Sequence, residues 1–333
     1  MFKEGRWLTA VRQTMIIVTI TIIMCEMGLR IFNQLYPLPF FYSTSYNRFR
    51  VKPHSSYYGF ELNSRGFHDV EFNIRKEPGT FRVLGLGDSF AFGVVPYAFN
   101  YLTVIEEKMK SSGMAFELIN MGIPGIGPRE YLAVFIHEGL QLKPDMVLLS
   151  FFIGNDFLET TKVNSLYRYS YLASLTKYLY DVSTKMGNFE FTTRNYDDEA
   201  SLFTSAAYVE LERMISGLFL KRNEYFETLL ADAVRHLANI KRICDLHGVR
   251  LVIALIPDEM QVEPILQRQV IEVSARDEDA YDFEKPNERL KGELRKLEID
   301  HVDLLPAFRE ETVRSRLYRP NDTHWNITHP SVI

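Results

Sequence analysis

Four short polar motifs carry residue types that can support nucleophilic chemistry. Ser89 brings a hydroxyl, which is a poor nucleophile until a base removes its proton. Near the carboxyl terminus, Asp322 and His324 bring an acid and an imidazole two residues apart. Asn155 adds an amide donor. Three motifs hold these groups: GDSFAFG (Gly87–Gly93), GND (Gly154–Asp156) and NDTHW (Asn321–Trp325). The fourth motif is the glycine-rich NMGIPGIG (Asn120–Gly127).

Each motif taken alone also has an ordinary structural explanation. Gly, Asp and Ser are common turn formers, and an Asp-x-His pair is more often a polar turn than a reactive dyad. The glycines of NMGIPGIG let backbone N–H groups approach a ligand closely, but they also suit a loop. If Ser89 opens a helix, the free N–H groups there favour a nearby developing anion. The order and position of all four motifs together favour chemistry.

The scaffold that would position these motifs is an α/β fold. Apolar runs and amphipathic helical stretches alternate from Phe81 onward. This alternation predicts βαβ units and a parallel sheet, whose ligand site lies beyond the carboxyl ends of the strands. The runs are FRVLGLG, FELINMG, DMVLLSFFIG, VRLVIALIP and IDHVDLLP, and helices are predicted near 97–111, 128–141, 223–246 and 285–298.

The amino terminus predicts a membrane anchor. QTMIIVTITIIMCEMGL (residues 13–29) has Glu26 as its only charge, and flanking residues can extend the helix to a full span. We expect a cytoplasmic tail over 1–12 and the anchor helix over 13–36. A cleaved signal peptide or a buried or interfacial helix are the alternatives. Lys3, Arg6 and Arg12 favour a cytoplasmic amino terminus, although basic residues at 48, 50 and 52 weaken that asymmetry.

Two further segments frame the main domain. Residues 37–80 are rich in Tyr, Phe, Pro and Asn and predict a linker and a small hairpin region. Within the domain, which we expect to span 81–333, residues 157–220 break the alternation and predict a helical insertion. Its aromatic residues favour packing, with substrate or membrane contact as alternatives. Its acidic residues Asp197, Asp198 and Glu199 favour a solvated loop over a metal site.

The set of motifs resembles the SGNH (GDSL-type) hydrolase superfamily, whose Ser, Gly, Asn and His blocks occur in this order. The upstream LNSRGFHD, the anchor and DTHWN resemble the membrane-anchored bacterial members related to polysaccharide O-acetyltransferases. The resemblance implies a three-layer, flavodoxin-like parallel sheet. It also implies Ser89 as nucleophile, His324 as base and Asp322 as the acid that orients the imidazole. The implied oxyanion hole comprises the N–H groups of Ser89 and Gly125 and the side chain of Asn155.

The choice of Gly125 follows that family pattern, whereas the Asp-x-His spacing and the carboxyl terminus depart from it. Gly125 is preferred to Gly122 because the family's oxyanion glycine follows the Asn of its block by five positions. Only Thr323 separates Asp322 from His324, whereas most members have two intervening residues. His329 is the alternative base. The sequence ends at NITHPSVI, where relatives continue into a final helix, so we expect that a truncation could impair activity.

The leading functional hypothesis is an acyl-ester hydrolase or O-acyl (acetyl) transferase that acts on an extracytoplasmic ester such as an acylated glycan. The resemblance implies a single-pass protein of the bacterial inner membrane, with a membrane acyl donor as a possible partner. The alternative is a catalytically inactive, membrane-tethered glycan-binding or assembly protein. The net charge of −5 gives no indication of a nucleic-acid partner. The motifs call for no cofactor or metal, and GLGDSFAFG lacks the glycine and lysine pattern of a nucleotide loop.

Overall fold

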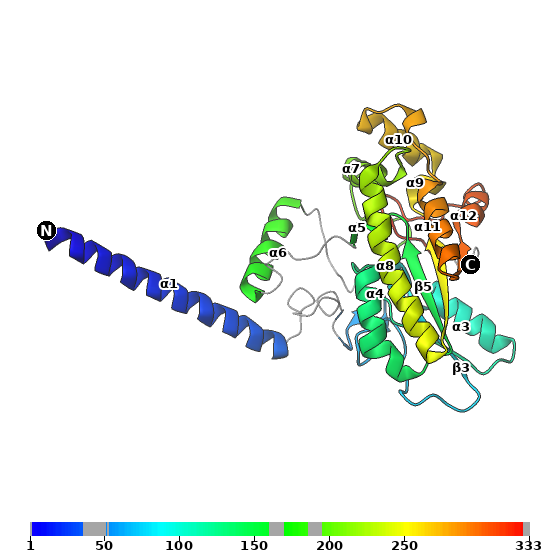
Figure 1. The fold of residues 1–333 in the computed structure, drawn as a ribbon, viewed down its shortest axis with the longest axis horizontal. Helices are drawn as coiled ribbons and strands as arrows, with labels where there is room; N and C mark the ends of the chain where they lie inside the picture. Colours follow the sequence, from blue (N-terminus) through cyan, green and yellow to red (C-terminus); the bar gives the residue numbers. More distant parts are fainter. Residues whose placement is uncertain (1, 36–50, 52, 160–169, 186–194, 329–333) are drawn as a thin grey trace. The chain divides into compact units, whose positions relative to one another are not determined.

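The computed structural model describes residues 2–35, 51, 53–159, 170–185 and 195–328. The chain divides into two compact units. One unit comprises Met1–Lys52 and Asn164–Gly187, and the other comprises Pro53–Val163 and Asn188–Ile333 (Figure 1). The second unit contains all four polar motifs.

The larger unit is built on a five-stranded parallel sheet, as predicted. Its strands lie in the order β4-β3-β5-β6-β7. Counted along the chain this is the order 2-1-3-4-5, which is the flavodoxin-like arrangement. The strands are β3 (Phe81–Leu86), β4 (Phe116–Asn120), β5 (Met146–Phe152), β6 (Arg250–Ile256) and β7 (Asp300–Asp303).

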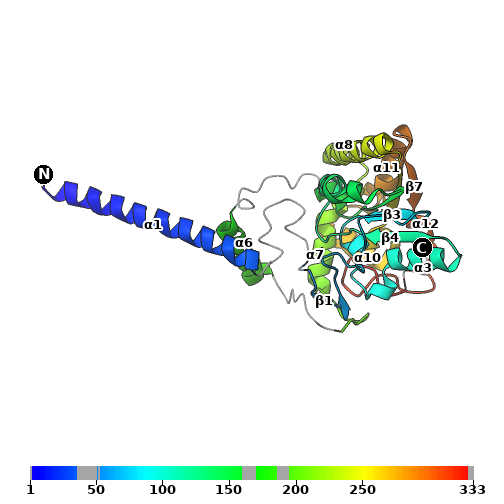
Figure 2. The same cartoon turned by 90° about the horizontal axis from the view of Figure 1, so that it is seen from below.

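Helices cover both faces of this sheet and give three layers (Figure 2). On one face lie α4 (Pro128–Val134), α8 (Glu224–His247) and α11 (Lys285–Lys296). On the other lie α3 (Tyr101–Ser111) and α12 (Leu305–Glu311). The core on the α3 side joins Leu102 of α3, Phe308 of α12 and Trp325 of the tail. The tail that carries the predicted acid and imidazole is therefore part of the core.

The helix boundaries follow local signals in the sequence. Asn100 and Asn223 cap α3 and α8 by accepting a backbone N–H, and Gly248 ends α8 in the left-handed region. The stretch predicted as one helix over 128–141 divides into α4, a π-helical turn and a short 3₁₀ turn. The remaining helices of this unit are α2 (Ser89–Phe92), α5 (Asp156–Glu159), α7 (Ser205–Ile215), α9 (Glu259–Val262) and α10 (Pro264–Ser274).

A short antiparallel hairpin of β1 (Ser56–Tyr57) and β2 (Phe60–Glu61) lies in the segment where a hairpin was expected. The LNSRGFHD motif follows it. The carboxylate of Asp69 accepts the backbone N–H of Asn120 at 2.8 Å, and Nδ1 of His68 lies 2.9 Å from the carbonyl oxygen of Phe92. Burial lowers the pKa of His68 to about 4, so this imidazole is neutral. The motif thus contacts the last residue of α2 and the last residue of β4.

The smaller unit contains α1 (Phe2–Leu35) and α6 (Tyr171–Lys185). In α1, Thr9–Phe32 is long and apolar enough to cross a membrane. The helix begins at Phe2, so the predicted tail over 1–12 is helical where it is described. The insertion expected over 157–220 contributes α6 to this unit and α7 to the larger one.

Arg82 on β3 connects the sheet to the segment that precedes β3 in the sequence. Its side chain is 1% exposed and donates to Glu117 on β4 and to the carbonyl oxygens of Asn73, Ile74 and Leu142. Truncation leaves several buried acceptors without a donor. We therefore expect Arg82→Met to lower the free energy of unfolding by about 3–5 kcal/mol.

The measurement is denaturant unfolding of the full-length protein in detergent. The matched control is Arg250→Met, because Arg250 also pairs across adjacent strands, with Asp300, but both side chains are more than half exposed. It should cost less than about 1 kcal/mol. Equal losses for the two variants would contradict a special role for the buried Arg82 contacts.

Candidate active site

A tight strand-to-helix turn presents Ser89 at the carboxyl end of β3. Gly87 allows this turn, because a Cβ there would lie 2.7 Å from Cβ of Ala91 and 3.0 Å from Cβ of Ser150. Oδ1 of Asp88 accepts the backbone N–H of Phe90 at 2.9 Å and so caps α2. Ser89 is the first residue of α2 and its side chain is partly exposed.

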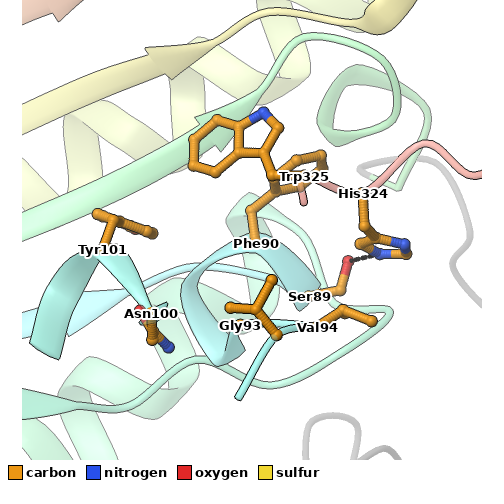
Figure 3. Close-up of a pocket in the computed structure, with 9 residues that line it drawn as sticks. Ser89, Phe90, Gly93, Val94, Asn100, Tyr101, His324 and Trp325 are labelled. Carbon is orange, nitrogen blue, oxygen red and sulfur yellow. Dashed lines mark hydrogen bonds between the residues drawn. The ribbon is translucent and has the colours of Figure 1, made fainter. Parts of the chain in front are cut away.

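The carboxyl-terminal tail brings His324 to Ser89 across 235 residues of sequence. Nε2 of His324 lies 2.9 Å from Oγ of Ser89 (Figure 3), and Nδ1 lies 2.7 Å from Oδ1 of Asp322. A hydroxyl, an imidazole and a carboxylate therefore form one continuous relay. This geometry lets the imidazole accept the hydroxyl proton while the carboxylate holds the other ring nitrogen.

A short hairpin-like turn fixes the tail. Tyr318 and Trp325 form an antiparallel bridge, and the backbone N–H of Arg319 donates to the carbonyl oxygen of His324 at 3.0 Å. Oδ1 of Asp322 also accepts the backbone N–H of His324 at 3.1 Å. One intervening residue, Thr323, is thus enough for the acid to cap its own turn and contact the imidazole. The shortened Asp-x-His spacing is compatible with the relay.

Arg319 adds a contact that the sequence analysis missed. Its guanidinium lies 3.0 Å from Oδ2 of Asp322, the carboxylate oxygen that His324 does not use, and both side chains are buried. Burial alone would raise the pKa of Asp322, but the imidazole of His324 and the guanidinium of Arg319 outweigh it and hold the pKa below its ordinary value. An arginine three residues before the acid was the available signal.

Of the three predicted oxyanion donors, Ser89 follows β3, and the other two follow the strands that flank β3. Gly125 follows β4; it is exposed and has a φ of +73°, which favours glycine. Asn155 follows β5 and is partly buried. Among the described residues, none accepts a hydrogen bond from the backbone N–H of Ser89 or Gly125 or from the side-chain amide of Asn155. These donors are available at the carboxyl edge of the sheet.

The loop that holds Gly125 is fixed against α2. Oδ1 of Asn120 accepts the N–H of Gly122, and its Nδ2 donates to the carbonyl oxygen of Ala91. A Cβ on Gly122 would lie 2.1 Å from the backbone nitrogen of Phe92, so no side chain fits there. Gly122 therefore serves the close approach of this loop to α2.

A small, mostly apolar pocket opens beside Ser89 and His324 (Figure 3). Phe90, Val94 and Trp325 form part of its wall. The aromatic ring of Phe90 contacts both the imidazole of His324 and the indole of Trp325. This pocket offers an apolar surface for a small acyl group next to the hydroxyl.

Two other aspartates near the site are buried and have structural partners. Asp156 accepts the hydroxyl of Tyr131 at 2.7 Å and the backbone N–H of Phe152 at 2.9 Å. Burial and the nearby charge of Asp88 raise the pKa of Asp156. Burial also raises the pKa of Asp88, to about 7. Asp88 therefore anchors its turn, and Asp156 orients the neighbouring backbone.

Other candidates differ from expectation or fall outside the described residues. His329, the alternative base, lies outside them. The acidic segment is a loop with Asp197 and Glu199 exposed, as predicted, but it also contacts the tail. Asp198 accepts the hydroxyl of Tyr196 and the backbone N–H of Ile327, and Glu199 pairs with Arg316 at 2.8 Å. These residues hold the tail because basic and backbone donors from 316–327 approach them.

Comparison with known proteins supports the resemblance. Residues 218–328 match the model of an SGNH hydrolase-like domain, that of the acetyltransferase AlgX. This part of the chain is similar to an SGNH hydrolase-like domain. The matched part includes Asp322 and His324, while Ser89 precedes it. The predicted resemblance is confirmed at this level, and the domain supports esterase or acetyltransferase chemistry.

Solved structures similar to this chain include TesA, an esterase and a GDSL-like lipase. TesA is 11% identical, with a TM-score of 0.41 over 75% of this chain and 92% of its own. Axe2, an acetyl-xylooligosaccharide esterase from Geobacillus, is 12% identical, with a TM-score of 0.42 over 75% and 89%. A GDSL-like lipase from Bacteroides thetaiotaomicron is 10% identical, with a TM-score of 0.36 over 76% and 84%. No curated protein sequence matches the chain.

The Arg319–Asp322 pair makes a testable prediction about pH. The guanidinium helps to hold the pKa of Asp322 below its ordinary value, so removing the cation should raise that pKa. Arg319→Gln should therefore reach half-maximal labelling of Ser89 by a fluorophosphonate at a higher pH than wild type, because its carboxylate takes up a proton more readily as the pH falls. Arg319→Lys keeps the charge and should stay close to the wild-type midpoint.

The measurement is the labelling rate of the full-length protein across a pH series. Because a general loss of folding lowers the rate at every pH, the midpoint separates an electrostatic effect from simple damage. The same midpoint in wild type and both variants would contradict the electrostatic role of Arg319.

Proposed function

We propose that the chain is a serine-dependent acyl-ester enzyme, an esterase or O-acyl (acetyl) transferase, which acts on an acylated glycan outside the cytoplasm. The observation that carries the proposal is the relay from Ser89 through His324 to Asp322, with contacts of 2.9 and 2.7 Å. The match to an acetyltransferase's SGNH hydrolase-like domain supports the acetyl group as the acyl unit.

In the first half-reaction, Oγ of Ser89 attacks the ester carbonyl carbon while Nε2 of His324 takes its proton. Asp322 holds the imidazole through Nδ1 and stabilises the imidazolium. The carbonyl oxygen becomes an oxyanion, for which the N–H groups of Ser89 and Gly125 and the amide of Asn155 are the proposed donors. Collapse of the intermediate breaks the bond to the leaving alcohol, which receives the proton from His324 and leaves an acyl-Ser89.

In the second half-reaction, a hydroxyl attacks the acyl-Ser89 carbonyl carbon and gives its proton to His324. If water attacks, the product is a free acid; if a sugar hydroxyl attacks, the acyl group is transferred. Ser89 recovers its proton from the imidazolium in both cases, so the enzyme is regenerated. The exposed position of Gly125 supports access by a bulky acceptor such as a glycan.

We further propose that α1 anchors the protein in the bacterial inner membrane as a single span. The length and apolar character of Thr9–Phe32 support this. The basic residues Lys3, Arg6 and Arg12 support a cytoplasmic amino terminus, which leaves the SGNH hydrolase-like domain on the extracytoplasmic side. A membrane protein that supplies the acyl donor would suit this arrangement.

Labelling with a fluorophosphonate tests the nucleophile. Wild-type protein should label, and Ser89→Ala should lose the signal by about 1,000-fold or more, because the attacking oxygen is gone. Ser112→Ala is the matched control; its hydroxyl is exposed and bonds only locally, so labelling should persist. Equal labelling of wild type and Ser89→Ala would exclude Ser89, and an unlabelled but folded wild type would favour the glycan-binding alternative.

The acceptor is tested with an acetyl donor, with and without an oligosaccharide. We expect Ser89-dependent acetate release without the oligosaccharide and an O-acetylated oligosaccharide when it is present, because both acceptors attack the same acyl-enzyme. Mass spectrometry of the glycan and quantification of acetate measure the two products. Acetate as the sole product under both conditions would argue against transfer and leave an esterase.

A further inference from the structure

The one charged residue in the apolar stretch 13–29 binds the start of another helix. Glu26 of α1 accepts three hydrogen bonds, each 2.9 Å long, from Oγ of Ser170 and from the backbone N–H groups of Tyr171 and Leu172. A carboxylate within a membrane span is costly unless donors surround it. Here, the first turn of α6 provides those donors.

The N–H groups at the start of α6 are paired by Glu26 and Ser170. The first N–H groups of a helix lack partners within the helix. Glu26 accepts two of them, from Tyr171 and Leu172, and Oγ of Ser170 accepts a third, from Ala173 at 3.1 Å. The next N–H, that of Ser174, makes a regular helical bond to the carbonyl oxygen of Ser170 at 2.9 Å. Pairing of these three end groups suits a helix end that lies where water is scarce.

Arg30 completes the contact between the two helices. Its guanidinium pairs with Glu26 at 2.7 Å and lies over the ring of Tyr171, 4.7 Å from the centroid. Tyr171 and Ser174 are buried on this side of α6. Arg30 therefore does more than extend toward the membrane surface: it closes one face of the Glu26 site.

The position of Glu26 in α1 fixes the depth at which α6 begins. The apolar segment ends at Phe32, six residues after Glu26. At about 1.5 Å per residue along a helix, Glu26 lies roughly 9 Å before that end. Interfacial helices bury their apolar faces about 5–10 Å into the headgroup boundary. If α1 spans the membrane, the start of α6 falls within that boundary, and the exposed Leu179 on α6 supplies apolar surface for it.

We propose that α6 is a membrane-interface helix, seated in the phospholipid headgroup boundary by the contact of its first turn with Glu26. This rests on the proposed membrane anchor and goes beyond it, because it assigns a second membrane contact to the insertion.

Depth-dependent fluorescence quenching tests the proposal on full-length protein in vesicles of phosphatidylethanolamine and phosphatidylglycerol. Single cysteines carry an environment-sensitive fluorophore in a Cys25→Ala background; Cys244 is fully buried and stays in place. The sites are Ile17→Cys on α1, Leu179→Cys on α6 and Leu246→Cys on α8, all exposed. Lipids that bear a quencher near the headgroup or at mid-chain report the depth of each site.

We expect quenching from mid-chain at residue 17, quenching near the headgroups at residue 179 and none at residue 246. Quenching at 17 without quenching at 179 would overturn the interfacial helix and leave the anchor intact. No quenching at 17 would overturn the anchor, and the interfacial helix with it. The catalytic proposal is measured separately by fluorophosphonate labelling of the same samples.

A second variant tests the role of Glu26. Glu26→Ala removes the acceptor of three donors, so quenching at residue 179 should fall at least twofold while quenching at residue 17 persists. Thr19→Ala is the matched control, because Thr19 is a polar residue of α1 whose hydroxyl bonds only to its own helix. Unchanged quenching at 179 in Glu26→Ala would overturn the assignment of Glu26 as the residue that seats α6.

Discussion

The arrangement of the site depends on one buried negative charge, the carboxylate of Asp322. Each of its oxygens faces a different group: Oδ1 meets His324, and Oδ2 meets Arg319. A buried carboxylate with only an imidazole partner would carry a large desolvation cost. The guanidinium offsets that cost while Oδ1 stays directed at the imidazole. The tail therefore keeps its turn, and with it the approach of His324 to Ser89.

Comparison with the neighbouring Asp88 and Asp156 shows what the charged partners of Asp322 contribute. Asp88, Asp156 and Asp322 are all fully buried, yet burial raises the pKa of the first two, whereas the pKa of Asp322 is lowered. The difference lies in the imidazole of His324 and the guanidinium of Arg319, since backbone and hydroxyl donors at Asp88 and Asp156 do not compensate for lost hydration. The carboxyl edge of the sheet thus favours the ionised form at the one aspartate that contacts the imidazole.

The parts predictable from sequence were those set by local pattern. Apolar runs predicted the five strands within one to three residues, and the motif order indicated that Ser89 and His324 would meet. Arg319 was missed because its pairing with Asp322 depends on how the tail turns, with Asn321 at a φ of +47°, which no periodic pattern reveals. The contacts of Asp198 and Glu199 were missed because their partners, from 316–327, are distant in sequence.

The insertion provides the partners of Glu26, the one charged residue in the apolar stretch 13–29. Glu26 interrupts an otherwise apolar helix, and its partners come from Ser170 to Leu172, 144–146 residues away. The opposite end of the insertion supports the relay: the carbonyl oxygen of Ala200 accepts from Arg319, whose guanidinium also lies over the ring of Tyr196. One inserted segment thus satisfies a charge in each compact unit. The described residues of the insertion therefore support Glu26 in one unit and Arg319, next to the relay, in the other.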